Sequence, residues 1–244
     1  MNSQYSVACN ICGCVDFIDM ISKRKLQMKP RIGVRCKNCH SLQRTRLFWL
    51  YIEKLNIMPN FKILHLAPER GIYNRLKNII SPENYVTADF DPSRYGFSRA
   101  RKIDLTQMDE WKSNEFDLII HIHVMEHVPC NLAYSFFHLH RMLKDGGKHM
   151  FIIPILDGVY DECFDKISDE ERTLRFGQYD HVRKFGRDGL LMTLGKFINL
   201  PDSFDATNDF SEELLLNSNI PKPYWKGMHG GTVFTLEKDS YKLK

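Results

Sequence analysis

Four cysteines near the N-terminus constrain the fold of this chain more than any other feature. They form two CxxC pairs, Cys9 with Cys12 and Cys36 with Cys39, separated by 23 residues. Each CxxC turn can present two thiolates to one ion, and two such turns complete a tetrahedral zinc site. Four unligated thiols, or a redox CxxC, are the alternatives. Since four thiolates leave no open coordination position, we expect a structural zinc ion.

The composition is that of an ordinary globular protein. Hydrophobic residues make up 43% of the 244 residues and charged residues 26%, which allows one full core and a small additional module. No apolar run approaches the ~20 residues that span a bilayer, and the N-terminus lacks the pattern of a signal peptide. We therefore expect a cytoplasmic protein without a membrane segment. The net charge of +4 permits a nucleic-acid partner but does not require one.

Strand-like and helix-like segments alternate along most of the chain. A helix over 42–57, capped by Ser41, is expected to link the cysteine module to the rest, and Met58-Pro59-Asn60 ends it. Strands are expected at 61–66, 85–88, 116–122 and 149–153, and helices at 72–80 and 131–144, the second stopped by Asp145-Gly146-Gly147. This alternation predicts an α/β fold with a parallel sheet and helices on both faces. We predict two domains, 1–58 and 59–244.

Several segments, in order, resemble the class I methyltransferases that use S-adenosylmethionine. They are ILHLAPERG (63–71), YVTADFDP (85–92), KIDLT (102–106), FDLIIHIHVMEHV (116–128) and RMLKDGG (141–147). The resemblance runs from Phe61 to Pro154 and implies a Rossmann-like sheet with S-adenosyl-L-methionine as cofactor. Together with the two CxxC pairs, the whole chain is similar to a subset of these enzymes that carries an N-terminal zinc ribbon.

The resemblance also implies which residues contact the cofactor. Asp89 ends the second strand, where its carboxylate can accept from both ribose hydroxyls, although it could instead be a turn aspartate, a role that Asp91 suits better. Asp104 would accept from the adenine amino group while Leu105 packs on the ring, with a loop aspartate as the alternative. The remaining lining residues in this interpretation are Phe90, His121 and His123.

The first cofactor loop departs from the pattern of the family. His65 stands at the usual acid position, Ala67 and Glu69 replace the first two glycines, and Gly71 remains. Ala67 nearly preserves the close backbone approach that glycine allows. Glu69 can compensate by binding the ammonium group of the cofactor. The alternative is a solvated Glu69 with weak or lost cofactor binding.

An insert over 155–189 is expected to hold the acceptor, because it follows the fourth strand at the edge where such sheets bind ligands. We predict His181 as the general base, with Asp180 or Arg183 contacting the acceptor and His127 as the rival base. Gly177 and Gly186 flank the segment and suggest a lid. The alternative is a solvated charged loop.

The predicted function is methyl transfer to oxygen or nitrogen of a small-molecule or glycan-like acceptor, which the arginines of the insert could hold if it is anionic. A second hypothesis is an RNA or protein methyltransferase that docks its substrate on a basic zinc module, although stacking aromatics are sparse there. The cations of that module are Arg31, Arg35, Lys37, Arg44 and Arg46. A third is a catalytically degenerate binding protein, stabilised by zinc.

Overall fold

A six-stranded sheet forms the centre of the molecule. The computed structural model of the chain describes residues 6–20 and 31–243. The strand order is β11-β7-β6-β3-β4-β5; strands β3 to β7 pair in parallel, and β11 pairs with β7 in the antiparallel sense. The strands are β3 (Ile63–Leu66), β4 (Tyr85–Asp89), β5 (Arg101–Lys102), β6 (Phe116–Ile122), β7 (Leu143–Ile152) and β11 (Phe234–Glu237).

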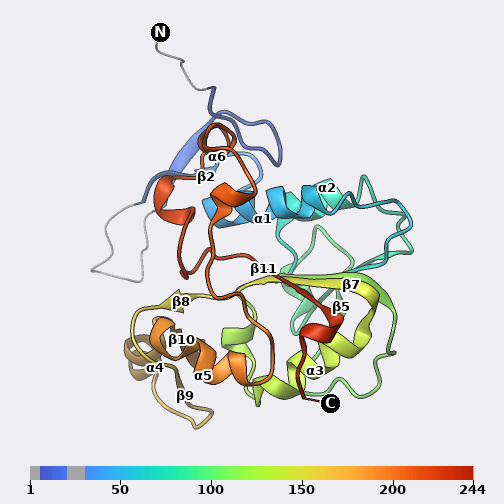
Figure 1. Cartoon of the computed structure of the whole chain (residues 1–244), viewed down its shortest axis with the longest axis vertical. Coiled ribbons are helices and arrows are strands. Elements are labelled where there is room, and N and C mark those ends of the chain that lie inside the picture. Colours follow the sequence, from blue (N-terminus) through green and yellow to red (C-terminus); the bar gives the residue numbers. More distant parts are fainter. Residues whose placement is uncertain (1–5, 21–30, 244) are drawn as a thin grey trace.

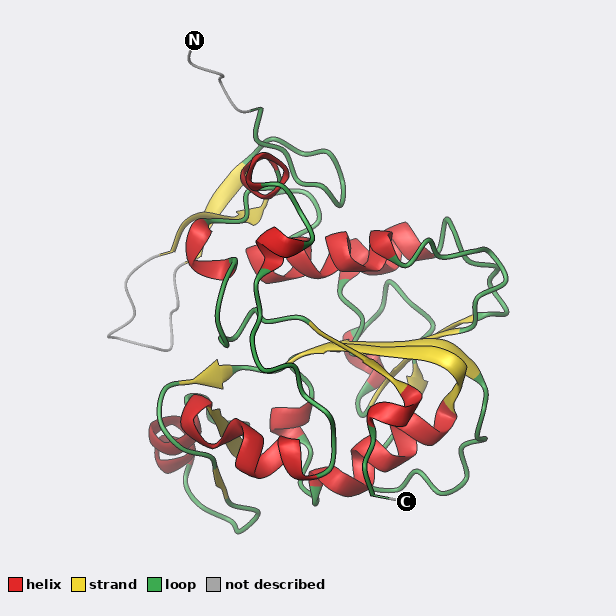
Figure 2. Cartoon of the chain, in the orientation of Figure 1, coloured by secondary structure: helices red, strands yellow, loops and turns green. Residues whose placement is uncertain are grey.

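Helices cover both faces of this sheet, which Figures 1 and 2 show from its edge. One face carries α1 (Gln43–Lys54) and α2 (Arg70–Leu76), and the other carries α3 (Leu132–Met142) and α5 (Leu190–Thr193). A further helix, α6 (Glu212–Asn217), lies beside the N-terminal module. The predicted Rossmann-like α/β architecture is therefore confirmed. In the described ranges, none of the helices has the length and apolarity that crossing a bilayer requires.

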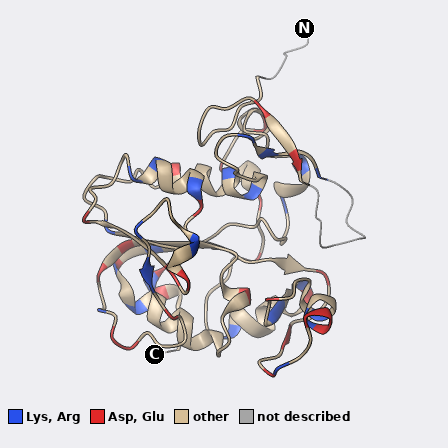
Figure 3. Ribbon diagram, turned by 180° about the vertical axis from the view of Figure 1, so that it is seen from behind, with Lys and Arg blue, Asp and Glu red and all other residues tan. Residues whose placement is uncertain are grey.

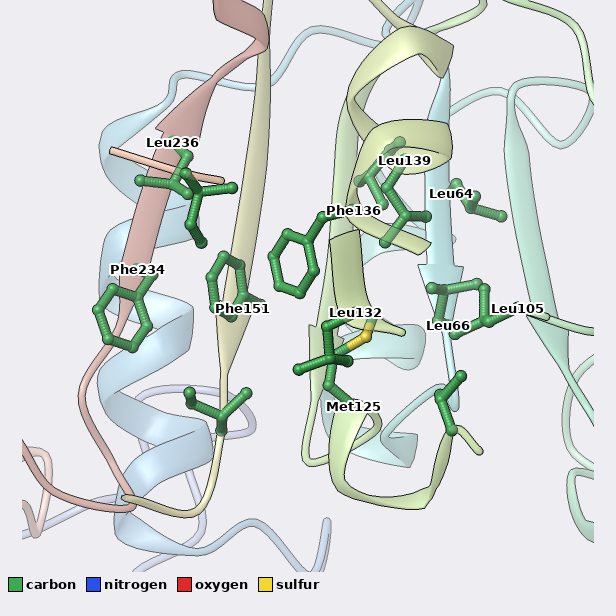
Figure 4. Packing of buried hydrophobic residues seen from close by; sticks show 14 of the residues in the cluster. Leu64, Leu66, Leu105, Met125, Leu132, Phe136, Leu139, Phe151, Phe234 and Leu236 are labelled. Atoms are coloured by element: carbon green, nitrogen blue, oxygen red, sulfur yellow. The ribbon is translucent and has the colours of Figure 1, made fainter. Parts of the chain in front are cut away.

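Alternate residues of the central strands pack into two different cores, because side chains alternate across a sheet. Leu118 and Ile120 of β6 belong to the core beneath α1, whereas Ile119 belongs to the core beneath α3. Figure 4 shows the second core, where Phe136 of α3 meets Phe151 of β7. Burying such a side chain contributes about 1.5–3 kcal/mol. Burial on both faces explains why β6 is apolar almost throughout.

Several predicted helix ends differ from the structure, and two of the differences concern residues to which a role was assigned. The N-cap residue of α1 is Leu42, not Ser41; the Ser41 hydroxyl instead lies 3.3 Å from the Cys9 sulfur and 3.2 Å from the Cys39 sulfur. The helix α3 ends at Met142, and β7 begins at the next residue, so the Asp145-Gly146-Gly147 segment lies in a strand. A Cβ at Gly147 would stand 3.0 Å from the Phe116 carbonyl oxygen; this glycine thus serves close strand packing.

The N-terminal module packs directly on the sheet domain. Its hairpin consists of β1 (Phe17–Met20) and β2 (Arg31–Cys36), which pair in the antiparallel sense. Cys9 and Cys36 belong to the same buried cluster as Trp49 of α1 and Ile63 of β3. The predicted domain boundary at residue 58 stays a prediction, and buried contacts continue across it.

Arg46 of α1 fastens this module to the C-terminal part of the chain. Its guanidinium is fully buried and donates to the carbonyl oxygens of Val34, Ser41, Ser218 and Asn219. Burial lowers the pKa of Arg46, while nearby cysteine thiolates favour its charged form. A buried cation beside the sulfur cluster compensates part of the negative charge of four thiolates.

Three buried histidines form a hydrogen-bonded chain within the core beneath α3. His140 Nδ1 lies 3.2 Å from the Lys238 carbonyl oxygen, His140 Nε2 lies 3.3 Å from His149 Nδ1, and His149 Nε2 lies 3.0 Å from His121 Nε2. The carbonyl can only accept, so His140 donates through Nδ1, His149 donates to His140, and His121 donates to His149. His121 Nδ1 is left without a partner among the described residues.

The row of three buried histidines should make the free energy of unfolding depend on pH. Burial holds the pKa of His121 at about 3 and that of His149 well below 6.5. The folded protein therefore binds fewer protons than the unfolded chain below about pH 6.5, so the stability is complete above that pH and is lost as pH falls toward 3. Thermal unfolding of His121→Gln, followed from pH 7 to pH 4, should show a shallower loss than the wild type. An identical pH profile for both proteins would contradict this assignment.

Candidate active site and zinc centre

A cavity of about 500 Å³ lies at the carboxyl ends of β3, β4 and β6. The chain continues from β3 toward β4 on one side, while β6 and β7 lie on the other, so this edge is the switch point where open α/β sheets bind ligands. Seven predicted site residues line it, namely Ala67, Asp89, Phe90, Asp104, Leu105, His123 and Asp180. Residues that were not assigned to the cofactor also line it, including Arg94, Tyr95 and His127.

Another cavity, of about 470 Å³, lies between the end of α3, the start of β7 and the C-terminal residues 237–243. It lies at the amino end of β7, whereas the parallel strands end at the first cavity. In this class of sheet, ligands bind at the carboxyl ends. The first cavity is therefore the candidate active site.

Two carboxylates stand at one end of this cavity. One oxygen of Asp89 accepts from the Asp91 N–H at 2.8 Å and the other from the Tyr95 hydroxyl at 3.1 Å. Asp104 Oδ1 accepts from the N–H and hydroxyl of Thr106 at 2.9 and 2.7 Å. These bonds fix both carboxylates, and each oxygen has further acceptor capacity for a ligand. Asp91 caps the 3-10 turn at Pro92–Arg94, the role expected of it.

The loop after β3 has a strained backbone at its first residue. Ala67 has a φ of +47°, and His123, just past the end of β6, has a φ of +56°. Both lie in the left-handed region that favours glycine, and both line the cavity. Ala67 therefore occupies the conformation that a glycine would take in this loop.

Glu69 is held in place by the residue at the usual acid position. His65 is fully buried, its Nδ1 lies 2.7 Å from the Tyr85 hydroxyl, and its Nε2 lies 3.0 Å from Glu69 Oε2. His65 thus orients the Glu69 carboxylate at the N-cap of α2. Whether this carboxylate binds the cofactor stays a prediction.

Gly71 does not approach the cavity. A Cβ at this position would stand 3.2 Å from Ile11 and 3.4 Å from Cys39, both in the cysteine module. The prediction that Gly71 contacts the cofactor is therefore corrected. The residue must be small because the first turn of α2 packs against the cysteine cluster.

His121 is also misplaced by the sequence interpretation. It is fully buried and its ring stacks on Phe151, with ring centroids 5.3 Å apart. His121 lies within β6 and faces the core, as Ile119 does two residues earlier, whereas His123 lies just past the strand end and lines the cavity. The lining role predicted for His121 is therefore corrected.

The insert folds into a compact unit instead of a free lid. It contains β8 (Ile155–Leu156), β9 (Asp161–Glu162), α4 (Asp169–Phe176) and β10 (Arg183–Gly186), with β10 between the other two strands. A Cβ at Gly186 would lie 2.1 Å from the backbone of Val159, so this glycine permits close packing and is no hinge.

Arg183 ties the insert to the 3-10 turn η2 (Met125–His127) that follows β6. Its guanidinium is fully buried and donates to the carbonyl oxygens of Met125 and Cys130 at 2.6 and 2.7 Å. It also pairs with Glu162 at 3.4 Å. With these bonds Arg183 positions the insert, and the predicted contact with an acceptor is corrected.

The structure pairs Asp180 with a different histidine from the one predicted. His127 Nδ1 lies 3.1 Å from the Asp180 carbonyl oxygen and 3.6 Å from its carboxylate. His181 is buried, with Nδ1 3.1 Å from the Phe176 carbonyl oxygen, and its ring packs edge-on against His127. Of the two imidazoles, His127 lines the cavity.

Glu126 is a site residue that the sequence interpretation missed. Its side chain is fully buried, and neither carboxylate oxygen has a hydrogen-bond partner within the described parts of the chain. Burial raises the pKa of Glu126 to about 8. A signal was present, because Glu126-His127 is an acid–imidazole pair placed directly after a buried strand.

Arg44 brings a positive charge to the same region from α1. Its Nε is buried and finds no hydrogen-bond partner among the described residues. Burial lowers the pKa of Arg44, whereas the nearby charges of Glu69 and Glu126 raise it. The helix of the N-terminal module thus supplies a cation close to two carboxylates at the switch point.

The four predicted zinc ligands come together in one cluster. Their sulfur atoms all lie within 4.8 Å of one another, with Cys9 and Cys39 3.6 Å apart and Cys12 and Cys36 3.5 Å apart. Tetrahedral bonds of about 2.3 Å require sulfur separations of about 3.8 Å. Cys9, Cys36 and Cys39 are buried and Cys12 is half-buried. Burial raises the pKa of Cys36 to about 11, so a cluster of four thiolates here needs a cation. The cluster is compatible with zinc.

Among the described residues, two of the five predicted cations do not belong to an exposed basic surface on this module. Arg46 is buried in the interior and Arg44 faces the switch point, so the exposed cations there include Arg35 and Lys37. Lys37 lies 3.8 Å from Asp16. Figure 3 shows acidic and basic residues interspersed over the fold.

Comparison with known proteins gives one family match. The pattern of the family described as "Methyltransferase domain" matches residues 73–151, about a third of the chain. The match excludes the cysteine module. A search of curated proteins finds no match.

Solved structures of similar fold come from several bacteria. An S-adenosylmethionine-dependent methyltransferase from Mesorhizobium loti is 12% identical with a TM-score of 0.49, covering 78% of this chain and 95% of that one. YcgJ from Bacillus subtilis is 12% identical with a TM-score of 0.46, covering 73% and 80%. A putative methyltransferase from Bacillus halodurans is 16% identical with a TM-score of 0.44, covering 78% and 94%. Similarity at this level carries no information on the acceptor.

The domain match spans the core of the candidate site. Residues 73–151 include Asp89 and Asp104 at one end of the cavity and His123 and His127 at the other. The cavity volume suits a cofactor-sized ligand, and fixed carboxylates face it where ribose and adenine would donate. Residues 73–151 are therefore similar to a methyltransferase domain, and the cavity that they help to line is the candidate active site.

Proposed function

We propose that the enzyme methylates an oxygen or nitrogen atom of a small acceptor bound beside His127. The observation that carries this proposal is the lining of the cavity, which has fixed carboxylates at one end and an imidazole with a carboxylate at the other. The insert covers this second end through Gln178 and Asp180. A cavity closed in this way suits a small molecule or the end of a glycan better than a folded macromolecule.

The adenosine part of the cofactor is assigned to the end with two carboxylates. Asp89 accepts from the ribose hydroxyls, Asp104 accepts from the adenine amino group, and Leu105 packs on the ring. When bound, S-adenosylmethionine supplies an electrophilic methyl group on a sulfonium. The protein aligns the acceptor with that methyl and excludes water.

The amino-acid part of the cofactor is assigned to the opposite charges at the switch point. Glu69, oriented by His65, suits the ammonium group. Arg44, whose Nε has no partner in the described chain, suits the carboxylate. The two charges compensate for the glycines that the first loop lacks.

His127 is the stronger candidate for the proton acceptor. Its Nδ1 donates to the Asp180 carbonyl oxygen, so the neutral ring directs the lone pair of Nε2 elsewhere. His181 packs against this ring and supports its orientation. In this proposal His127 takes the acceptor proton, and Asp180 contacts the acceptor.

The cysteine cluster is assigned a structural zinc ion. Four sulfur ligands leave no position for a substrate, and the cluster packs against Gly71 of α2. The zinc module therefore supports the helix that carries the first cofactor loop. Docking of RNA or protein on this module remains the second candidate, and the two exposed cations Arg35 and Lys37 are its only support on the described surface of β2 and the following turn.

The first prediction concerns Arg44. Arg44→Gln should weaken S-adenosylhomocysteine binding by about tenfold or more, since a charge-assisted hydrogen bond contributes about 1.5–3 kcal/mol. It should leave 5′-methylthioadenosine unaffected, because that compound lacks the amino-acid portion. Isothermal titration of both compounds makes the comparison, with the exposed Arg35→Gln as control. Equal losses for both compounds would refute this assignment.

Removal of the Asp89 carboxylate should weaken binding of the adenosine portion of the cofactor. Asp89→Asn should weaken both compounds to a similar extent, because both contain the ribose that Asp89 contacts. The measurement is the same pair of titrations. If methylthioadenosine binds Asp89→Asn as tightly as wild type, the ribose lies elsewhere.

A further prediction separates the two histidines. His127→Ala should lower kcat by roughly 10²–10⁴-fold, the usual cost of losing a general base. S-adenosylhomocysteine binding should stay near wild type, which shows that the fold is intact. Turnover is measured once a methyl acceptor has been found by screening small alcohols and amines. A variant with normal kcat would remove His127 from the chemistry.

The zinc assignment predicts one zinc ion per chain. Cys36→Ser should lose this zinc and lower Tm; a loss of about 3 kcal/mol corresponds to roughly 6–12 °C for a chain of this size. Cys163→Ser, a thiol outside the cluster, should retain both the zinc and the Tm. Metal analysis with thermal unfolding tests this. Zinc content unchanged in Cys36→Ser would exclude the four-sulfur site.

A further inference from the structure

We infer that Glu126, His127 and His181 bind a divalent metal ion at the edge of the active-site cavity. One carboxylate oxygen and one nitrogen from each ring lie within 4.8 Å of one another. The group is separate from the cysteine cluster and uses nitrogen and oxygen donors in place of sulfur. Its chemical role, but not its existence, rests on the proposed function.

The strongest support is the state of Glu126. Both of its oxygens are buried and lack hydrogen-bond partners among the described residues. The polar atom facing Oε1 is His123 Nδ1, at 3.4 Å. His123 Nε2 lies 3.0 Å from the Gly230 carbonyl oxygen and must donate to it, so in the neutral ring Nδ1 carries a lone pair. This contact leaves both carboxyl oxygens of Glu126 without a hydrogen bond, and a cation beside them would stabilise the ionised carboxylate that burial alone disfavours.

The two histidines are held in the form that binds metal. His127 Nδ1 faces the Asp180 carbonyl oxygen at 3.1 Å, and His181 Nδ1 faces the Phe176 carbonyl oxygen at 3.1 Å. Each ring donates through Nδ1, which leaves the lone pair on Nε2. Metal-binding histidines commonly donate their other N–H to a backbone carbonyl in this way, which fixes the tautomer and ring orientation.

The donor set indicates the kind of ion. Two imidazoles and one carboxylate suit zinc, iron(II), manganese or cobalt, and three protein ligands leave positions open for another molecule. Bonds of about 2.1 Å place ligand atoms about 3–4 Å apart, so separations of up to 4.8 Å need to shorten by at most about 1–2 Å. The Asp180 carboxylate, 3.6 Å from His127 Nδ1, adds negative charge beside the site.

An ion at this position would act on the acceptor, because His127 and Asp180 also line the cavity. It would bind the acceptor oxygen at an open position and lower the pKa of its O–H group. With the ion bound, His127 Nε2 serves as its ligand and is no longer the proton acceptor, so the proton leaves to solvent. The oxygen lone pair then forms the new O–C bond to the methyl group, and the breaking S–C pair stays on sulfur, which becomes a neutral thioether. No oxidation or reduction takes place.

Manganese is the probe that tests this site. Mn²⁺ prefers oxygen and nitrogen ligands and does not compete well for four thiolates. Protein that carries one zinc per chain, and no excess zinc, is therefore titrated with Mn²⁺, and the EPR signal of the free ion is followed. We expect one Mn²⁺ per chain and a rise in Tm on binding. Glu126→Gln, which preserves side-chain shape, should weaken Mn²⁺ binding by at least tenfold and abolish the rise in Tm.

A control variant distinguishes Mn²⁺ binding at this site from binding to exposed carboxylates elsewhere. Glu170→Gln, an exposed residue of α4, should bind Mn²⁺ like wild type. If Glu126→Gln does not fold, His127→Gln takes its place, because His127 lies at the cavity wall. Wild-type protein that binds no Mn²⁺, or that binds it no better than Glu126→Gln and His127→Gln, overturns the proposal.

Titration of the same samples with S-adenosylhomocysteine distinguishes this failure from that of the proposed function. Binding of S-adenosylhomocysteine without Mn²⁺ binding removes only the metal site. Mn²⁺ binding without S-adenosylhomocysteine binding supports the metal site and removes the proposed function.

Discussion

The parallel pairing of β3 with β6 is the interaction on which the rest of the structure depends. The chain extends from this pair in two directions, to β4 and β5 on one side and to β7 and β11 on the other. The crossovers must then leave a crevice at the carboxyl ends of β3 and β6. Ala67 and His123, which follow these two strands, both take a positive φ there. The strain lies where the cofactor must approach the backbone.

The cysteine module packs against the central sheet and contributes to its hydrophobic core. Its sulfur atoms, α1 and the strands share one buried cluster, and Arg46 links its backbone to that of residues 218 and 219. Arg44, two residues earlier on the same helix, reaches the carboxylates at the switch point. A single helix thus connects the metal cluster, the C-terminal segment and the cofactor region. Folding of the module and formation of the site are consequently coupled.

The sequence predicted elements better than it predicted the purpose of individual residues. Apolar runs predicted β3, β4 and β6 near their observed ends, because burial on both faces leaves few other patterns. The start of β7 was predicted wrongly, because its first residues, from Leu143, include the polar and glycine segment that was expected to end a helix. Glycines were harder to interpret. Gly71 was assigned to the cofactor loop and Gly186 to the end of a lid, yet each must be small because another segment packs against it. His121 and His123 are two residues apart, but only the second lies beyond the strand end. Glu126 was missed because its burial comes from the insert, which is distant in sequence.

The histidine chain beneath α3 has a consequence for how this protein can vary. Its three rings must donate in one order, since the Lys238 carbonyl oxygen at one end can only accept. An apolar side chain in place of one ring leaves the neighbouring ring without its hydrogen bond. A side chain that accepts where the ring donated places two acceptors against each other, because the remaining rings cannot change their direction of donation. The residues at positions 121, 140 and 149 should therefore be substituted together in evolution. Related sequences are expected to keep all three imidazoles or to replace all three by a packed hydrocarbon core.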